Sequence, residues 1–380
     1  MKILLIGEYS RLHNSLKEGL IALGHQVTLV SSGDGLKQFE SDYLLTSKIK
    51  NNRFLSLLNS GLIRLFGVNL IQNEYYQQFK KLLPQFKNFD VVQLINEDAL
   101  GVTPKQSIKL YSQLFKQNKS IYLLACGEDY VTINYFLNPA NGYSVLTPYL
   151  NNTALKNTFN FSLKYTTEAY KNLHEFINKN INGVICSDMD YHRAYINHSK
   201  YLGLIPNPIN TDLLEFKPLK TDGKIHIFHG INSTSSLKKG ANYFSEALQI
   251  IANKYPEKVS ISSTIDLPYT KYIQSYDQAH IILDQVYSYD QGYNALEAMY
   301  KGKVLFTGAE KEWLQYYNLK ENSVAINALP NADYLVEKLE WLINNPNQIQ
   351  SIGSHASAFV KQHHDYITIA QRYLDTWNKN

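Results

Sequence analysis

The residues with the clearest chemical potential lie in a hydroxyl-rich loop that follows an apolar run at residues 224–228. The candidate ligand-binding residues of this loop are His229, Gly230, Asn232, Lys238, Lys239 and Gly240. Amides and hydroxyls can donate hydrogen bonds to the oxygens of a diphosphate, and each lysine adds a compact positive charge. The P-loop pattern G-x-x-x-x-G-K-[ST] is absent. The loop therefore indicates a diphosphate site of another type, with a flexible surface loop as the alternative.

A second group of candidates follows the apolar run at residues 280–284. They are Asp284, Asp290, Gly292, Tyr293, Asn294, Ala295 and Glu297. A helix is predicted to begin near Tyr293, and Gly292 leaves the amides of the first turn accessible to a phosphate. Glu297 lies four residues into this helix, where its carboxylate can accept hydrogen bonds from ribose hydroxyls. The pattern therefore predicts a nucleotide site in the second half of the chain.

Polar residues also follow two apolar runs in the first half. Gly7, Ser10 and His13 follow the run at residues 2–6, and Glu128 and Asp129 follow the run at residues 121–126. Ligands of open α/β sheets bind beyond the carboxyl ends of the strands, which makes these residues candidates. A tight turn explains Gly7 equally well, and the two acids could instead cap the next helix. The sequence leaves both interpretations open.

The elements that must position these residues are short apolar runs that alternate with longer helical patterns. Runs of this length indicate parallel strands buried on both faces. We expect strands at residues 2–6, 26–31, 90–95, 121–126 and 183–186, and again at 224–228, 259–263, 280–284, 303–306 and 323–326. Alternation of strands and helices predicts doubly wound sheets. Because the pattern occurs twice, the predicted fold class is α/β with two Rossmann-like domains.

A domain boundary is predicted at residues 205–210, where Pro206 and Pro208 prevent regular structure. We therefore expect an N-terminal domain at residues 1–205 and a C-terminal domain at residues 206–360. The last segment, residues 361–380, contains an amphipathic helix at residues 365–379. The length of 380 residues suits two domains, since single cores rarely exceed about 250–300 residues.

Composition favours a cytoplasmic protein. Hydrophobic residues make up 44% and charged residues 18% of the chain, which is a globular balance. No run approaches the roughly 20 apolar residues that span a bilayer, and no signal-peptide pattern precedes the first apolar run. Cys126 and Cys186 lie inside apolar runs, as small buried residues do in a reducing compartment. No group of residues has the spacing of a metal site, so no metal is expected.

The net charge of +4 is unevenly distributed, with +6 on residues 1–205 and −2 on the rest. Part of the positive excess falls in residues 46–87, where lysines and arginines alternate with Leu, Ile and Phe. A basic amphipathic segment can lie on an anionic membrane surface, at the inner face of the cell membrane in a cytoplasmic protein. An ordinary solvated helix face is the alternative. No nucleic-acid partner is expected.

The residues around Glu297 carry a specific resemblance. The run from Gly292 to Gly302, with Leu296-Glu297-Ala298-Met299 before Gly302-Lys303-Val304, resembles the donor-site motif of the family 4-type, retaining glycosyltransferases of the GT-B fold. Lys238-Lys239-Gly240 resembles the basic phosphate-binding loop of that family, and the loops at residues 7–13, 126–129 and 205–210 occur in the same order. The likeness spans nearly the whole chain and implies two parallel sheets that face each other across a cleft.

The resemblance implies roles for individual residues. Lys239 would neutralise the donor diphosphate, Glu297 would hold the ribose as the second acid of the E-x(7)-E motif, and Asp129 would act across the cleft. Glu128, with Gly7, Ser10 and His13, would lie on the acceptor side. The substrate would be a nucleoside-diphosphate sugar, and no cofactor is expected. The final helix would cross back onto the first domain.

The chain departs from the family pattern at two places. Tyr289 stands where the first acid of E-x(7)-E belongs, and Asp290 or the more distant Asp284 could replace that acid. The arginine of the basic loop is missing, and Lys238 could compensate for it. We therefore carry two hypotheses: a glycosyltransferase that adds sugar to a surface glycan or lipid-linked acceptor, and a non-catalytic sugar-nucleotide-binding or partner-stabilising protein. A sugar-nucleotide epimerase is a third.

Overall fold

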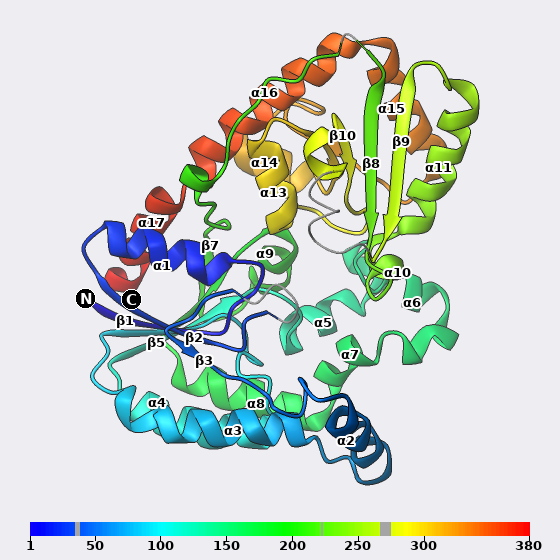
Figure 1. The fold of residues 1–380 in the computed structure, drawn as a ribbon. Helices are drawn as coiled ribbons and strands as arrows, with labels where there is room; N and C mark the ends of the chain where they lie inside the picture. The colour runs from blue at the N-terminus through cyan, green and yellow to red at the C-terminus, as the bar shows by residue number, and fades with distance from the viewer. Residues whose placement is uncertain (35–38, 222, 267–274) are drawn as a thin grey trace.

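The computed structural model describes residues 1–34, 39–221, 223–266 and 275–380. Within these residues the strands form two sheets, both entirely parallel (Figure 1). The first has the order β3-β2-β1-β4-β5-β6-β7 and the second has the order β12-β11-β10-β8-β9. The predicted α/β fold with two Rossmann-like sheets is confirmed.

The strands lie close to their predicted positions. The first sheet consists of β1 (Lys2–Ile6), β2 (Gln26–Ser31), β3 (Tyr43–Leu44), β4 (Val91–Leu94), β5 (Ser120–Ala125), β6 (Gly183–Cys186) and β7 (Tyr201–Leu204). The second consists of β8 (Ile225–Ile231), β9 (Val259–Ile265), β10 (Ile281–Leu283), β11 (Val304–Thr307) and β12 (Ile326–Asn327). The central strands β1, β4, β5, β6 and β10 are almost wholly buried, as expected for strands covered on both faces. The sequence did not predict β3 and β7.

Helices cover both faces of the first sheet. The helices of the first half are α1 (Leu12–Ala22), α2 (Arg53–Phe66), α3 (Leu70–Leu82), α4 (Pro104–Lys116), α5 (Tyr130–Phe136), α6 (Thr147–Asn151), α7 (Asn160–Leu163), α8 (Glu168–Asn180) and α9 (Met189–Tyr195). Helices α3, α4 and α8 lie on one face, and α1 lies on the other (Figure 1). Helix α2 projects from one corner of this half.

The second half contributes α10 (Ser236–Lys239), α11 (Ala241–Lys254), α13 (Tyr293–Tyr300), α14 (Lys311–Tyr317), α15 (Ala332–Asn344), α16 (Pro346–His363) and α17 (Tyr366–Lys379). Helix α17 packs against α1 of the first half (Figure 1). Gly19 permits this approach, because a Cβ at Gly19 would lie 2.3 Å from the carbonyl oxygen of Tyr366. The Tyr122 hydroxyl donates to the Trp377 carbonyl at 3.1 Å, so the chain end is fastened to β5.

Each sheet has a point at which the strand order reverses. In the first sheet β1 lies between β2 and β4, and in the second β8 lies between β9 and β10. Loops that leave neighbouring strands at such a point diverge, which opens room for a ligand. The predicted residues that follow β1, β8 and β10 are therefore placed at the positions that topology favours.

Among the described residues, no single helix has the length and composition to cross a membrane. In the part of the chain that the structure describes, one bent pair of helical segments, Arg53–Phe66 and Leu70–Gln85 at an angle of 102°, passes the same test together.

Candidate functional site

The loop after β8 brings its lysines to the end of β10. Helix α10 is a single turn that ends at Gly240, whose φ of +67° starts α11 in a new direction. A side chain at Gly240 could not fit, because its Cβ would lie 2.3 Å from Val286. Lys239 forms an ion pair of 2.7 Å with Asp284, which also accepts from the Thr307 hydroxyl at 3.1 Å. Lys239 and Asp284, predicted separately, are thus brought together.

The neighbouring lysine points to the other half of the chain. The Lys238 ammonium group donates to the Glu128 carboxylate at 2.5 Å and to the Ser162 hydroxyl at 2.6 Å. Ser162 in turn donates to Glu128 at 2.9 Å. Glu128 follows β5, so the carboxyl ends of the two sheets meet here. Lys238 and Glu128 were predicted on the donor and acceptor sides, and the structure joins them directly.

Among the described residues, nothing covers the first turn of α13 at Gly292. Gly292 caps this helix and is exposed, and no described atom lies within 4 Å of a Cβ built on it. Its φ of −73° is one that any residue can adopt, so the glycine is not required by the backbone. Glu297 lies half-buried on the same helix. A helix N-terminus that opens onto unfilled space favours an anion.

Three residues near this turn differ in accessibility. The Ala295 amide donates to the Gly292 carbonyl at 3.0 Å, so it is used within the first turn of the helix. The Tyr293 side chain is buried, and its hydroxyl lies 2.7 Å from the Ser15 hydroxyl in the first half. Asn294 is exposed, and its carbonyl accepts from the Tyr276 hydroxyl. The Tyr293 side chain therefore serves the contact with the first half.

The residues at the end of β8 are partly structural. His229 is 2% exposed and packs edge-on against Phe244. Burial and the nearby Lys239 charge lower its pKa to about 4, so the ring is neutral at pH 7. Its Nδ1 has no partner among the described residues. Gly230 is still part of β8, and the exposed Asn232 caps the next turn by accepting from the Thr234 amide and hydroxyl.

On the acceptor side, two predicted residues belong to the core. Asp129 is fully buried, accepting from the Thr132 amide at 2.7 Å and the Tyr195 hydroxyl at 2.7 Å, and it caps α5. Each oxygen already accepts a hydrogen bond in a side chain with no exposed surface, so the helix-capping interpretation accounts for Asp129. His13 is also fully buried, between the Gly7 carbonyl and Gln93. Burial lowers the pKa of His13 to about 3, so the ring is neutral at pH 7 and has no exposed surface.

The start of the loop after β1 is shaped by packing. Gly7 has a φ of +87°, and a Cβ there would lie 2.3 Å from Ile95. The turn interpretation therefore accounts for Gly7. Ser10 is half-buried, has a φ of 52°, and donates its amide to Asp34. Of the predicted acceptor-side residues, Glu128 and Ser10 remain candidates.

Asp290 does not replace the missing acid of the motif. It is 5% exposed, and its oxygens accept from the amides of Met189 at 2.9 Å and Gln291 at 2.6 Å. Burial raises its pKa to about 7. Tyr289, at the motif position itself, stacks under the Arg193 guanidinium, 3.5 Å from the ring centre, and against Tyr143. This position therefore serves contact between the two halves.

The sequence analysis missed the first-half residues of that contact. Asp190 accepts from the Ser288 hydroxyl at 2.5 Å and from the Tyr289 amide at 3.1 Å, and Tyr143 donates to Glu310. Asp190 and Arg193 follow the end of β6, so the strand-end rule applied to β6 would have found them. Ser162 follows no strand, and no pattern in the sequence marks it.

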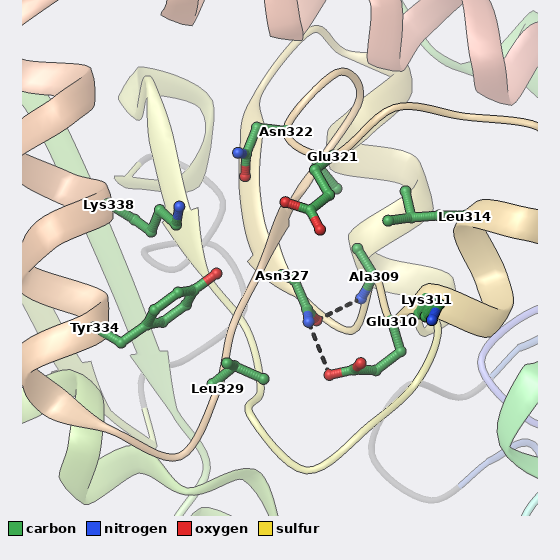
Figure 2. A pocket seen from close by; sticks show the side chains of 11 residues that line it. Ala309, Glu310, Lys311, Leu314, Glu321, Asn322, Asn327, Leu329, Tyr334 and Lys338 are labelled. Atoms are coloured by element: carbon green, nitrogen blue, oxygen red, sulfur yellow. Dashed lines mark hydrogen bonds between the residues drawn. The ribbon is translucent and has the colours of Figure 1, made fainter.

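A pocket of about 290 Å³ lies beside the ends of β11 and β12. Figure 2 shows Tyr334 and Lys338 of α15 on the side opposite Leu314 of α14. Asn327 organises the pocket wall, accepting from the Ala309 amide at 2.9 Å and donating to Glu310 at 2.8 Å (Figure 2). The residues predicted from the sequence are not among those that line it. In the part of the chain that the structure describes, no group of three or more His, Cys, Asp or Glu side chains is placed to hold a metal.

Comparison with known proteins adds two findings. Residues 234–375 match the family model described as "Glycosyl transferase-like". No curated protein sequence matches the chain.

Solved structures resemble the whole chain. Sucrose-phosphate synthase from Thermosynechococcus elongatus is similar over 100% of this chain and 99% of its own, with a TM-score of 0.59 and 13% identity. Anabaena HepE in complex with UDP-glucose covers 100% of both chains, with a TM-score of 0.59 and 11% identity. UDP-GlcNAc 2-epimerase from Neisseria meningitidis, bound to UDP-GlcNAc, also covers 100% of both, with a TM-score of 0.53 and 11% identity. At these identities the similarity establishes a shared fold.

Proposed function

We propose that the chain, which has the GT-B fold, is a glycosyltransferase that transfers a sugar from a nucleoside-diphosphate sugar to a glycan or lipid-linked acceptor. The observation that carries this proposal is the pairing of Lys239 with Asp284 at the strand-order reversal of the second sheet. Strand β10, which ends just before Asp284, leads through a loop to the first turn of α13. A diphosphate placed there meets an ammonium group and helix amides together.

The chemistry asks mainly for charge stabilisation. As the anomeric bond breaks with oxocarbenium character, negative charge grows on the departing nucleoside diphosphate, and fixed positive groups lower that barrier. Lys239, with three N–H donors, can share its charge between Asp284 and a phosphate oxygen. Glu297, on α13, accepts from the ribose hydroxyls. These groups suffice without a metal, and the family 4-type resemblance supports a retaining outcome.

The site also supports a second function. With Tyr289 stacked on Arg193, no acid occupies the first motif position, and the related fold of an epimerase shows that GT-B architecture serves other sugar-nucleotide chemistry. A protein that binds a sugar nucleotide without transfer would keep Lys239 and Glu297. We place the transferase first because the donor half matches the glycosyl transferase-like model.

A panel of UDP-, GDP- and ADP-sugars tests the proposal. Release of nucleoside diphosphate, with slow hydrolysis in the absence of acceptor, is expected for a transferase. Interconversion of sugars without release would indicate an epimerase, and tight nucleotide binding without turnover would indicate a binding protein.

The ribose assignment has its own variant. Glu297→Gln should weaken nucleoside-diphosphate binding by about 1–3 kcal/mol, because the amide removes the charge and one of the two oxygen acceptors offered to the ribose hydroxyls. Glu340→Gln is the matched control, since this helical glutamate of the same half pairs with Lys254 away from the site. Unchanged nucleotide affinity in folded Glu297→Gln protein would contradict the assignment.

We propose further that the protein acts in the cytoplasm on the synthesis of a surface polysaccharide or glycoconjugate. The acceptor would enter from the first half, past Glu128 and Ser10. A lipid-linked acceptor would require the enzyme to reach a membrane surface.

A further inference from the structure

Helix α2 presents its apolar side chains to the outside of the molecule. The exposed fractions of Phe54, Leu57, Leu65 and Phe66 are 69%, 66%, 77% and 70%. Leu55, Leu58, Ile63 and Val68, on or next to the helix, are also exposed. The structure describes all fourteen residues of α2, and the one buried among them is the polar Asn59. This is the reverse of the usual arrangement, in which a helix buries its apolar face.

Hydrogen bonds hold α2 in place. The Asn52 side chain caps its start by accepting from the amides of Phe54 and Leu55, and Gly67 ends it in the left-handed conformation. In the middle, Asn59 accepts from the Leu70 amide at 2.7 Å and donates to Asn69 at 3.3 Å, which ties α2 to the start of α3. The helix is therefore fixed without using its apolar side chains, which stay available for a partner.

The apolar side chains form one face with a basic edge. At 3.6 residues per turn, Phe54, Leu58 and Leu65 lie nearly in line, flanked by Leu57 on one side and by Leu55 and Phe66 on the other. Arg53 and Arg64 lie on the same edge of the helix, beyond Leu57, one near each end. Both arginines are exposed, as are Lys48 and Lys50 just before the helix. No acidic residue occurs in the sequence between Asp42 and Glu74.

We propose that α2 is a membrane-docking helix, which lies in the headgroup region of an anionic bilayer with this apolar face toward the acyl chains. The basic edge meets the anionic headgroups, as in interfacial amphipathic helices. A second copy of the chain fits less well, because pairing two such faces would bring two sets of basic residues together with no acidic residue to oppose them. Fourteen helical residues extend about 21 Å, short of the roughly 30 Å hydrocarbon core, so α2 lies along the surface.

Membrane docking is inferred from α2 alone. What docking does for the enzyme rests on the proposed function. If the acceptor is lipid-linked, docking through α2 holds the first half of the enzyme at the surface that carries the acceptor. Membrane binding and sugar transfer are therefore tested separately.

Flotation with vesicles tests the docking. The purified full chain is mixed with phosphatidylcholine vesicles with or without phosphatidylglycerol, at low and high salt. We expect binding to the phosphatidylglycerol vesicles that falls with salt. The double variant Phe54→Ser/Leu65→Ser should lose at least about tenfold in vesicle partitioning, because it removes two apolar side chains that insert among the acyl chains. Leu213→Ser is the matched control, at a 62% exposed leucine elsewhere, and should bind as the parent does.

Three outcomes would overturn the proposal. They are no binding of the parent to anionic vesicles, equal binding of the double variant, and self-association of the parent that the double variant abolishes, which would make α2 an interface between copies. Arg53→Gln/Arg64→Gln should retain the fold and lose the preference for phosphatidylglycerol. Hydrolysis of a sugar nucleotide in the absence of vesicles should be unchanged in all α2 variants. If no sugar nucleotide is turned over while flotation still depends on α2, the docking stands and the proposed function fails.

Discussion

Two of the contacts between the halves of the chain are opposite in character. One, the closed contact, consists of Asp190 and Arg193 of the first half and Ser288, Tyr289 and Asp290 of the second, and its second-half members are at most 7% exposed. The other, the open contact, is the trio of Lys238, Glu128 and Ser162, with side-chain exposures of 21% for Lys238 and 15% for Glu128. A buried polar contact fixes geometry because its groups have no other partner, whereas a partly solvated ion pair can exchange partners at little cost. The closed contact therefore sets how the halves sit, and the open contact is where a ligand can intervene.

The largest expected effect comes from cutting the closed contact. Asp190→Ala leaves the Ser288 hydroxyl and the Tyr289 amide without their acceptor and removes the charge beside Arg193. We expect the free energy of unfolding to fall by about 2–4 kcal/mol, as for a broken buried network. Urea denaturation measures the change. Asp375→Ala, at an exposed position of α17, is the control and should stay within about 0.5 kcal/mol. A loss for Asp190→Ala no larger than the control's would mean that the closed contact does not fix the interface.

Gly308, beside the closed contact, and Gly292, at the start of α13, should respond differently to the same substitution by alanine. A Cβ at Gly308 would lie 2.5 Å from main-chain atoms of Ser288 and Asp290, whereas a Cβ at Gly292 meets no described atom within 4 Å. Gly308→Ala should therefore destabilise the fold by about 1–3 kcal/mol, since a packed main chain must shift. Gly292→Ala should leave the melting temperature unchanged and weaken nucleoside-diphosphate binding, because the methyl group enters the space proposed for the phosphates. Calorimetry of binding and of unfolding checks both, and undiminished nucleotide affinity in Gly292→Ala would move the phosphate site away from α13.

Much of the fold could be predicted from the sequence, because parallel strands buried on both faces are continuous apolar runs. The run at residues 2–6 coincides with β1, and that at 183–186 coincides with β6. In strand β7, which reads Tyr-Leu-Gly-Leu, Gly203 with a φ of +125° interrupts the apolar run, and the pairing with β6 shifts register beside it. Strand β3 has two residues and leaves no periodicity to recognise.

The site was predicted less completely, for a physical reason. Topology places residues at strand ends, but only tertiary packing decides whether a side chain faces a ligand or the core. Asp129 and Glu128 are neighbours in the sequence. Asp129 is buried against Tyr195 of α9, whereas Glu128 binds Lys238 of the other half. Lys238 and Lys239 diverge in the same way. Such partners lie tens to more than a hundred residues away, so a local pattern does not reveal them.

The pH dependence of stability gives a smaller effect at the closed contact. Burial raises the pKa of Asp290 to about 7, against about 3.9 in an unfolded chain. Its contribution to stability is fully present below pH 4 and is lost as the pH rises through 7, because folding then requires a buried charge. Asp290→Asn cannot ionise, so its stability relative to the parent should rise between pH 5 and pH 8, at up to about 1.4 kcal/mol per pH unit. Glu8 and Asp129, whose pKa values burial also raises to about 7, titrate in both proteins and cancel in the difference. Parallel stability–pH curves for parent and variant would refute a neutral-pH titration of Asp290.

The smallest change in stability is expected at the open contact, where a substitution also tests how the donor is bound. Glu128→Gln keeps the size of the side chain and removes the charge that holds Lys238, so the free energy of unfolding should change by no more than about 1 kcal/mol. If the Lys238 ammonium group is shared between Glu128 and the donor diphosphate, releasing it should tighten nucleoside-diphosphate binding by about twofold to fivefold, the scale of one partly solvated ion pair. Glu312→Gln, at a more exposed glutamate 4.0 Å from Arg193 of the other half, is the control for a general charge effect. Tighter binding in Glu128→Gln alone would identify the open contact as the point where the donor competes with the acceptor half for a lysine. Equal affinity in both variants would leave Lys238 a structural bridge and Lys239 the sole lysine of this loop that serves the diphosphate.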